Sequence, residues 1–448
     1  MNVVLISSYE LGRQPFGLAS AAAWLKREGA RVVCLDLSVQ RIDEEAIASA
    51  DLVAFYLPMH TATRIAAKAV PRIRAINPRA RLGFYGLYAP VSESTLRNLG
   101  AEAILGGEFE SGLAEWVRRA GHGPAGEGPW PQTEPVVRLV RQRFLAPARE
   151  GLAPLSSYAR LLLPGGEARL AGYTEASRGC KHLCRHCPIV PVYRGRFFVV
   201  QQDVVLEDVR RQVAAGARHI TFGDPDFLNA PGHSLALLRA MHAEHPDITY
   251  DVTIKIEHLI QHAKHLDSLR ETGCLFITSA VESIDDRVLV ILEKGHTRDD
   301  FLRSVELCQR AGVTLSPTFV AFTPWIDRQG YCDLLSLLAG LDLIEQVAPI
   351  QLAIRLLIPS GSRLLEVPEV RRMVEPFDQA VLVHPWLHDD PDMDRLQREV
   401  EALVAAATPG ASRRSLFEEI WLLAGLRERD LPAVSRAAVP YLTEPWYC

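Results

Sequence analysis

Three closely spaced cysteines are the residues of this sequence with the clearest chemistry. Cys180, Cys184 and Cys187 stand in Ser-Arg-Gly-Cys-Lys-His-Leu-Cys-Arg-His-Cys-Pro, which gives the spacing Cys-x3-Cys-x2-Cys. Thiolates are soft ligands that suit iron–sulfur clusters. A cubane cluster has four irons, so three local cysteines leave one iron open to another ligand. The spacing therefore predicts a [4Fe-4S] cluster with a vacant coordination position.

Zinc is the competing interpretation of the same three cysteines. Four-ligand zinc sites usually pair two knuckles of two ligands each, and no second knuckle is found in this sequence. A disulfide framework would distribute its cysteines through a small secreted chain. Here three of the eight cysteines are clustered and the others are isolated. The pattern favours the iron–sulfur cluster.

The elements around the cysteines form a series of alternating strands and helices. Six strands are predicted, at Leu170–Ala176, His219–Gly223, Thr249–Lys255, Leu275–Ala280, Val313–Val320 and Gln351–Leu357. Six β/α units fall short of the eight of a closed barrel, so we expect a partial (β/α)6 barrel. The cysteines follow the first strand, at the carboxyl end, where such barrels place their chemistry.

The chain before the barrel predicts a separate α/β domain. Apolar strands are expected at Val3–Ile6, Val32–Leu35, Leu52–Leu57, Leu82–Tyr85 and Ala103–Leu105. Buried apolar runs that alternate with helices indicate a doubly wound parallel sheet. We therefore expect this domain over 1–120, a Pro/Gly-rich linker over 121–165, the barrel over 166–365 and a helical C-terminal region over 366–448.

Composition narrows the class of protein and of partner. The chain has 448 residues, of which 48% are hydrophobic and 23% are charged, as in globular proteins. A net charge of −5 offers no general attraction to nucleic acids or acidic membranes. The sequence has no signal-peptide pattern and no apolar run of the roughly 20 residues that a spanning helix needs. We expect a cytoplasmic protein.

The cysteine motif after the first barrel strand resembles that of the radical S-adenosylmethionine (SAM) superfamily. That family usually has an aromatic residue before the last cysteine, where this chain has His186. The resemblance implies an enzyme whose cluster binds SAM at the open iron and cleaves it reductively. It also implies a small-molecule substrate and an electron donor such as flavodoxin or ferredoxin.

The same resemblance suggests SAM-binding residues at the ends of two strands. Gly-Asp-Pro-Asp, with Asp224 and Asp226, stands where the family commonly has a Gly-Gly-Glu-like segment that contacts the methionine amino group. A turn is the alternative, since Asp-Pro suits one. Glu282 matches a glutamate that meets the ribose or the amino group in related enzymes, with an ordinary surface glutamate as the alternative.

Five further residues are candidates for cofactor binding. Ser316 and Thr318 lie in the fifth strand, where the family's backbone lines the adenine. Arg355, flanked by apolar residues, needs a buried partner, which can be the cofactor carboxylate or a structural ion pair. Lys255 and Glu257 follow the third strand and are similar candidates.

The first 120 residues resemble the cobalamin-binding domain that precedes the barrel in one branch of the superfamily. The resemblance rests on Gly17–Ser20, Asp36 and Gly106–Glu110. The Asp-x-His-x-x-Gly segment that supplies a cobalt ligand elsewhere is absent, and the bulk of Tyr85–Tyr88 can fill the cofactor cleft. Cobalamin is therefore an open possibility.

The C-terminus resembles a radical SAM subgroup whose tail ends in Cys-(Cys or selenocysteine)-Ala-Glu-Pro. Tyr441 and Leu442 stand where the tail's pair would be, and Cys448 is the last residue. We expect the tail to fold over the active site, with Cys448 as a catalytic residue that ligates the open iron or lies near the substrate. A free terminus is the alternative.

Several reactions are compatible with these features. A 5′-deoxyadenosyl radical can abstract hydrogen from a small molecule, with or without cobalamin-dependent methyl transfer. Cleavage of another carbon–sulfur bond would deliver a 3-amino-3-carboxypropyl group, as in the resembling enzyme of arsinothricin biosynthesis. A non-catalytic cluster or corrinoid sensor is the alternative from another class of protein.

Overall fold

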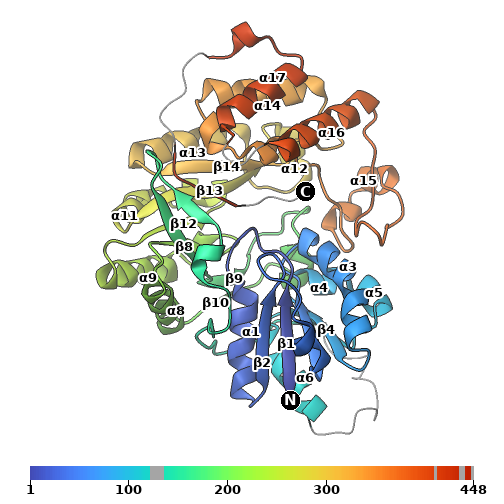
Figure 1. The fold of residues 1–448 in the computed structure, drawn as a ribbon. Helices are drawn as coiled ribbons and strands as arrows, with labels where there is room; N and C mark the ends of the chain where they lie inside the picture. Colours follow the sequence, from blue (N-terminus) through green and yellow to red (C-terminus); the bar gives the residue numbers. More distant parts are fainter. Residues whose placement is uncertain (122–135, 408–410, 433–438, 445–448) are drawn as a thin grey trace.

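The computed structural model of the chain describes residues 1–121, 136–407, 411–432 and 439–444. An N-terminal α/β unit lies against a second, larger α/β unit, and helices of the C-terminal part lie at the far end of the second unit (Figure 1). This arrangement confirms the predicted fold class, a doubly wound parallel sheet followed by a partial barrel and helices.

The N-terminal unit is built on a six-stranded parallel sheet with the order β2-β1-β3-β4-β5-β6. Its strands are β1 (Asn2–Ser7), β2 (Arg31–Asp36), β3 (Leu52–Tyr56), β4 (Arg81–Tyr85), β5 (Ala103–Gly107) and β6 (Val137–Arg138). The chain passes from β1 to β2 on one side and then returns to β3 on the other, which makes the sheet doubly wound. Strand β6 comes from the segment that the sequence predicts as a linker.

Helices cover both faces of this sheet. One face carries α1 (Phe16–Arg27) and α6 (Glu110–Gly121), and the other carries α2 (Glu44–Ala48), α3 (His60–Ile76), α4 (Tyr88–Val91) and α5 (Glu93–Asn98). Successive strand residues point to opposite faces. Val3 therefore belongs to the apolar cluster of α1, and Val4 to that of α3. Burial on both faces explains the continuous apolar strands of the sequence.

The second unit is a half-barrel sheet with the order β14-β13-β12-β11-β8-β7-β15. Its parallel strands are β8 (Ala168–Thr174), β11 (His219–Phe222), β12 (Thr249–Thr253), β13 (Cys274–Glu282) and β14 (Thr314–Phe319). Strands β7 (Arg160–Leu162) and β15 (Tyr441–Leu442) extend one edge in antiparallel pairing.

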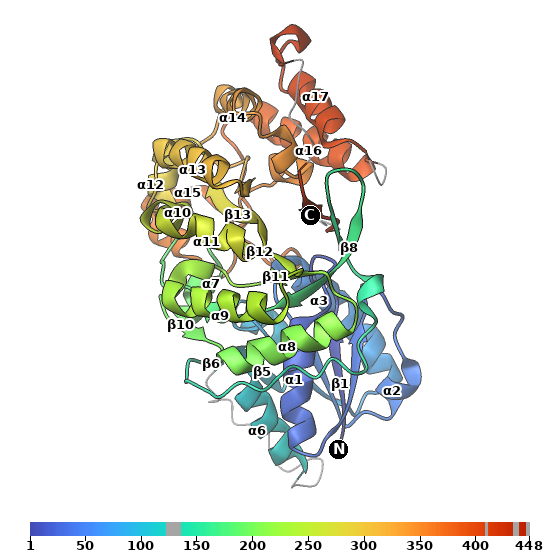
Figure 2. The ribbon, with the colours of Figure 1, turned by 90° about the vertical axis from the view of Figure 1, so that its left-hand side faces the viewer.

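Helices lie on the outer side of the half-barrel (Figure 2). They are α8 (Gln202–Ala214), α9 (Pro231–Glu244), α10 (Ile256–Gln261), α11 (Leu266–Glu271), α12 (Asp286–Ile291), α13 (Arg298–Ala311) and α14 (Arg328–Gly340). Their apolar faces and the sheet share one large hydrophobic core. The predicted β/α alternation is therefore present.

The predicted strand at Gln351–Leu357 is wrong. Residues Pro349–Leu352 form a 3-10 turn, and only a single parallel bridge, from Arg355 to Phe322, continues the sheet. Proline has no backbone N–H to donate to a sheet and is well suited to the first position of a helical turn. The apolar residues here are buried by the turn instead.

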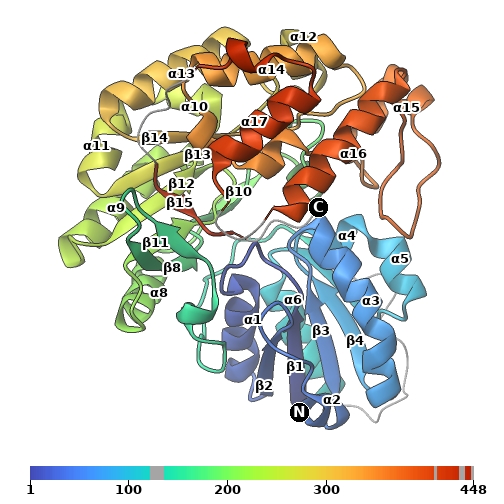
Figure 3. The ribbon, with the colours of Figure 1, turned by 45° about the horizontal axis from the view of Figure 1, so that its top comes forward.

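Three helices of the C-terminal region close one end of the half-barrel. They are α15 (Pro368–Met373), α16 (Pro391–Ala406) and α17 (Arg413–Leu423), and α16 and α17 lie beside α14 in Figure 3. Residues of α16 and α17, such as Val400 and Ile420, belong to the barrel core. Among the described residues, no helix combines the length and apolar composition needed to cross a membrane.

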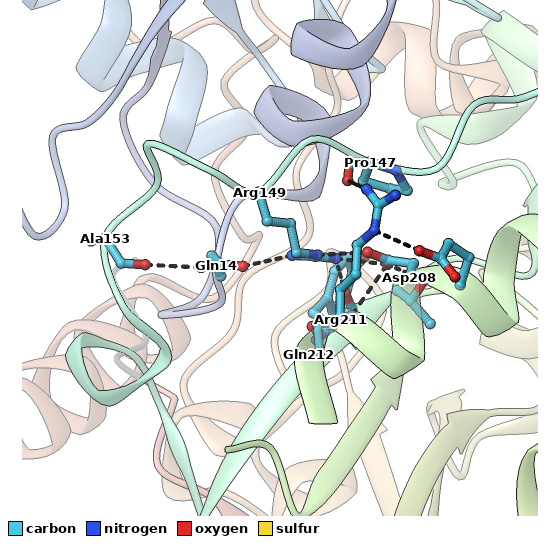
Figure 4. Close-up of polar contacts among 10 residues, drawn as sticks. Gln14, Pro147, Arg149, Ala153, Asp208, Arg211 and Gln212 are labelled. Carbon is cyan, nitrogen blue, oxygen red and sulfur yellow. Dashed lines mark hydrogen bonds and ion pairs between the residues drawn. The ribbon is translucent and has the colours of Figure 1, made fainter. Parts of the chain in front are cut away.

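A segment between the two sheets joins them through Arg149, whose side chain is only 10% exposed (Figure 4). The guanidinium of Arg149 donates to both carboxylate oxygens of Asp208 on α8, over 2.6 and 2.8 Å. It also donates to Gln14 of the N-terminal unit over 2.7 Å and to the carbonyl of Tyr173 over 2.6 Å. One side chain thus connects the N-terminal unit with a strand and a helix of the barrel.

Candidate active site

The three cysteines lie on a loop between β9 (Ser177–Gly179) and α7 (Ile189–Tyr193), just after β8. Strand β9 pairs with β10 (Phe197–Val199) in antiparallel fashion. Gly179 has φ +74°, and a Cβ atom there would lie 2.5 Å from the Arg196 carbonyl oxygen, so the turn into the loop requires glycine. The Arg185 backbone N–H donates to the Leu292 carbonyl over 2.9 Å and holds the loop against the barrel.

Burial makes the loop thiols unfavourable places for an uncompensated negative charge. Burial raises the pKa of the Cys187 thiol to about 12 and also raises the pKa of Cys180. The neighbouring Cys184 and Cys180 raise the pKa of Cys187 further. Buried thiols ionise when a metal centre compensates the charge. The donor set therefore fits a metal cluster.

Glu282 is tied directly to this loop. Its Oε1 lies 3.0 Å from Nε2 of His186 and accepts from Nζ of Lys294 over 3.3 Å. Burial opposes ionisation, but Lys294 and His186 together lower the pKa of Glu282 to about 2. Glu282 also has φ +69° at a bulge in β13, a strained conformation of the kind found at functional sites. The sequence indicates Glu282 but not its two partners.

Asp224 turns back toward the residues before the cysteine loop. It accepts from the Ser177 hydroxyl over 2.5 Å and from the Ala176 backbone N–H over 2.9 Å. Burial raises the pKa of Asp224 to about 7, and these hydrogen bonds oppose that rise. In this geometry Asp224 supports the approach to the loop, and its predicted contact with SAM stays a prediction.

Asp226 lies in a histidine cluster beside Cys180. Its Oδ2 lies 2.6 Å from Nδ1 of His258 and 3.5 Å from Nε2 of His182. Burial raises the pKa of Asp226, but the two imidazoles outweigh it and lower the pKa to about 2. Neither histidine is predicted from the sequence, although His182 stands inside the cysteine motif.

Lys255 and Glu257 border the same cluster. Nζ of Lys255 donates to Oε2 of Glu257 over 2.9 Å and lies 3.2 Å from Nδ1 of His182. Lys255 is buried, whereas the side chain of Glu257 is 41% exposed. The structure therefore brings both predicted residues to the cysteine loop, where Glu257 lies at the rim.

The remaining predicted cofactor residues are apart from this loop. Ser316 and Thr318 line a cavity of about 150 Å³ inside the half-barrel, together with Thr278. Arg355 donates to Asp394 over 2.5 Å and to the Trp386 carbonyl over 2.6 Å. Its guanidinium also lies 3.5 Å from the Trp386 ring centroid. These contacts match the structural ion pair that the sequence leaves open for Arg355.

A comparison with known families identifies the second α/β unit. The model of the Radical SAM superfamily matches residues 174–334, which include the cysteine loop, Glu282 and the strands from β11 to β14. The second α/β unit therefore contains a radical SAM domain. The predicted recognition is thus confirmed at the level of the superfamily.

Curated relatives match this chain over part of their length. The tRNA-2-methylthio-N(6)-dimethylallyladenosine synthase of Chlorobium phaeovibrioides is 27% identical over 202 residues, which are 40% of this chain and 43% of that protein. The synthase of the same name from Syntrophotalea carbinolica is 31% identical over 156 residues, or 32% of this chain and 34% of that protein. The matches therefore span less than half of these relatives.

Two solved structures share the fold of the enzyme over much more of the chain. The radical SAM methyltransferase TsrM from Kitasatospora setae, with tryptophan and a SAM analog bound, has a TM-score of 0.60 at 20% identity, covering 76% of this chain and 72% of that chain. The cobalamin-dependent radical SAM enzyme OxsB, with aqua-cobalamin bound, has a TM-score of 0.68 at 12% identity, covering 94% and 71%. Both confirm the cobalamin-binding-like fold before the barrel.

The radical SAM fold implies a [4Fe-4S] cluster and SAM, and the three thiols of the cysteine loop, of which Cys184 is buried, fit the cluster. Cobalamin would need a cavity between the N-terminal unit and the barrel that is large enough for its corrin ring. A cavity there has a volume of about 310 Å³, at the small end of the range for drug-sized ligands. Tyr56, Tyr85 and Phe109 pack together beside it, with ring centroids 5.0–6.0 Å apart. In this conformation the aromatic side chains leave too little space for a whole corrinoid. This agrees with the expectation that the bulk of Tyr85–Tyr88 can fill the cofactor cleft.

The described part of the tail packs on the barrel. Strand β15 pairs with β7, and Glu444 forms an ion pair with Arg13 of the N-terminal unit. The guanidinium of Arg413 lies over the aromatic ring of Tyr441, with its Cζ atom 4.1 Å from the ring centroid. The predicted catalytic residue Cys448 lies outside the described residues, so its role stays a prediction.

Proposed function

We propose that this radical SAM enzyme holds a [4Fe-4S] cluster through Cys180, Cys184 and Cys187, cleaves SAM reductively and acts on a small-molecule substrate by radical chemistry. A flavodoxin- or ferredoxin-type protein supplies the electron. The observation that carries the proposal is the cysteine loop at the carboxyl end of β8, with the ionised Glu282 tied to it through His186.

When bound, the cluster supplies the electron that breaks a carbon–sulfur bond of the SAM sulfonium. The side chains around the loop orient SAM and keep its charges compensated. Glu282 stays ionised because Lys294 and His186 face its Oε1, which leaves Oε2 to accept from an ammonium or a ribose hydroxyl.

A small-molecule substrate is favoured over the tRNA named for the curated relatives. Those relatives match about two fifths or less of this chain, so their remaining parts have no counterpart in the comparison. The net charge of −5 also provides no general attraction to a phosphate backbone. The cavity between the units has the volume of a small ligand.

Anaerobic reconstitution tests the cluster. We expect about four irons and four acid-labile sulfides per chain. Replacing Cys180, Cys184 or Cys187 by alanine should abolish the cluster, because two thiolates cannot retain a cubane that already has an open iron. Cys332→Ala is the matched control, since Cys332 is buried in α14 away from the loop. One tightly bound zinc without labile sulfide would contradict the proposal.

Product analysis after reduction in the presence of SAM tests the reaction. 5′-Deoxyadenosine is expected if the radical abstracts hydrogen. Methylthioadenosine would instead indicate transfer of the 3-amino-3-carboxypropyl group. A reconstituted, reducible cluster that forms neither product would contradict catalysis and favour a sensor.

A further inference from the structure

The cavity between the two units lies where the carboxyl edges of the N-terminal sheet and the barrel face each other. Glu10 and Tyr56 line it from the N-terminal unit, and Tyr173 and Glu175 line it from the barrel. Gly179, the residue before Cys180, is also part of its wall. A ligand in this cavity of about 310 Å³ would therefore lie next to the cysteine loop.

Glu10 is a buried carboxylate that lacks a counter-ion in this cavity. It is 5% exposed, and its Oε2 has no hydrogen-bond partner among the described residues. Burial raises the pKa of Glu10 well above its ordinary value, and the nearby Glu175 and Asp36 raise it further. A buried carboxylate without a partner carries a large desolvation cost. A cation in the cavity would offset that cost.

The cations nearest Glu10 are engaged by other carboxylates. Arg13 pairs with Glu444, and Arg149 pairs with Asp208. Both arginines lower the pKa of Glu10, but burial and the neighbouring Glu175 and Asp36 outweigh them. Among the described residues, no cationic side chain forms an ion pair with Glu10, so its carboxyl group can ionise when a cationic ligand enters the cavity.

Arg178 also lines the cavity, and it is a second arginine there besides Arg13. Its guanidinium lies 2.6 Å from Glu110 and 2.7 Å from Glu175, so it too is engaged by carboxylates. Three carboxylates, including Glu108 at 3.7 Å, surround this one arginine. Both arginines that line the cavity, Arg13 and Arg178, are thus already paired with carboxylates other than Glu10.

Aromatic rings form the rest of the wall and also suit a cation. Tyr56, Phe109 and Tyr173 all line the cavity. Two of these rings already lie beside cations, because Arg13 is 5.1 Å from the Tyr173 centroid and Arg178 is 5.2 Å from the Phe109 centroid. Aromatic faces attract ammonium and guanidinium groups within about 6 Å. A carboxylate beside aromatic rings is a typical arrangement for binding an organic ammonium ion.

We propose that this cavity binds the ammonium or amidinium group of a small organic cation, with Glu10 as its counter-ion. The assignment of this cation as the substrate of the radical reaction rests on the proposed function. The binding itself does not, because it depends on Glu10 and the aromatic wall and not on the cluster. SAM also carries an ammonium group, so the test must separate the two ligands.

Binding of benzylamine, which is protonated at neutral pH, and of its neutral analogue benzyl alcohol provides the test. The reconstituted full-length enzyme should bind benzylamine at least roughly tenfold more tightly, since a hydrogen bond to a charged group accounts for such a factor. Glu10→Gln should remove this preference. Glu45→Gln, which removes a negative charge from the exposed side of α2, should retain it. Calorimetric titration under anaerobic conditions measures the affinity of each of the three proteins for both probes.

Equal affinity of the wild-type enzyme for the two probes would overturn the proposal, and so would an unchanged preference in Glu10→Gln. Iron content and melting temperature establish whether Glu10→Gln is folded. If this variant does not fold, the affinities of the wild-type enzyme for the two probes still test the proposal. If SAM displaces benzylamine competitively and Glu10→Gln loses SAM affinity, the cation is SAM and the proposal is wrong. Glu10-dependent benzylamine binding in an enzyme that cannot cleave SAM would contradict the proposed function alone.

Discussion

Glu282 keeps a negative charge in a buried position because Lys294 and His186 face it. We expect Glu282→Gln to weaken SAM binding by roughly tenfold or more, since losing a hydrogen bond to a charged group costs about 1.5–3 kcal/mol. Iron content should stay intact, because a carboxylate is not a soft iron ligand. Equilibrium dialysis with SAM measures the change, with the exposed Glu306→Gln as control. Unchanged affinity would return Glu282 to a structural role.

Asp224 should make stability depend on pH. Its pKa is about 7 in the folded protein, because burial disfavours the charged form, and about 3.9 in an unfolded chain. The folded state therefore binds more protons between these values, and the free energy of unfolding falls as pH rises from about 4 to 7, by up to ~1.4 kcal/mol per pH unit.

Asp224→Asn removes the titrating carboxyl but keeps an acceptor for the Ala176 N–H. We expect urea denaturation of this variant to show a smaller loss of stability over that pH range than the wild type. An identical pH profile for the two proteins would contradict the raised pKa.

At the scale of elements, α8 is held to β8 and to the N-terminal unit by one buried carboxylate. Asp208 accepts from Arg149, from the Thr174 hydroxyl over 2.8 Å and from Gln212 over 3.1 Å. Asp208→Asn should lower the free energy of unfolding by about 3–5 kcal/mol, because it leaves Arg149, whose side chain is only 10% exposed, without its counter-ion. Denaturant titration measures this effect.

Glu207→Gln on the same helix is the matched control. Glu207 pairs with Arg210 and Arg211, and all three side chains are at least 40% exposed. Exposed pairs contribute about 0–1 kcal/mol, so this variant should be close to the wild type in stability. Comparable losses in both variants would show that Asp208 does not act through its buried pair.

The elements were largely predictable where burial on both faces produces continuous apolar runs. Strands β1 and β3 are of this kind, and their predicted cores agree with the structure. The segment Gln351–Leu357 is also rich in apolar residues, but apolar composition does not distinguish a buried strand from a buried turn. The preceding Pro349 was the local signal for the turn.

At the scale of the whole molecule, the tail connects the barrel edge with the N-terminal unit. Tyr441 and Glu444 line the cavity inside the half-barrel, as does Arg13. Deleting residues 441–448 should therefore open this cavity to water and reduce product formation from SAM, while the cysteine loop retains its iron. Iron analysis and product yield before and after truncation measure this. Unchanged yield would mean that the tail does not serve as a lid.

The sequence by itself indicated the three candidate cluster ligands, because Cys180, Cys184 and Cys187 lie on one short loop and their spacing is a local property. It also determined the order of the two α/β units. Only the tertiary structure decided which charges meet. His186 and Glu282 are 96 residues apart, and Asp224 and Asp226 turn to different neighbours although they are two residues apart. Such contacts depend on the register and curvature of the sheet, which bring distant strand ends together.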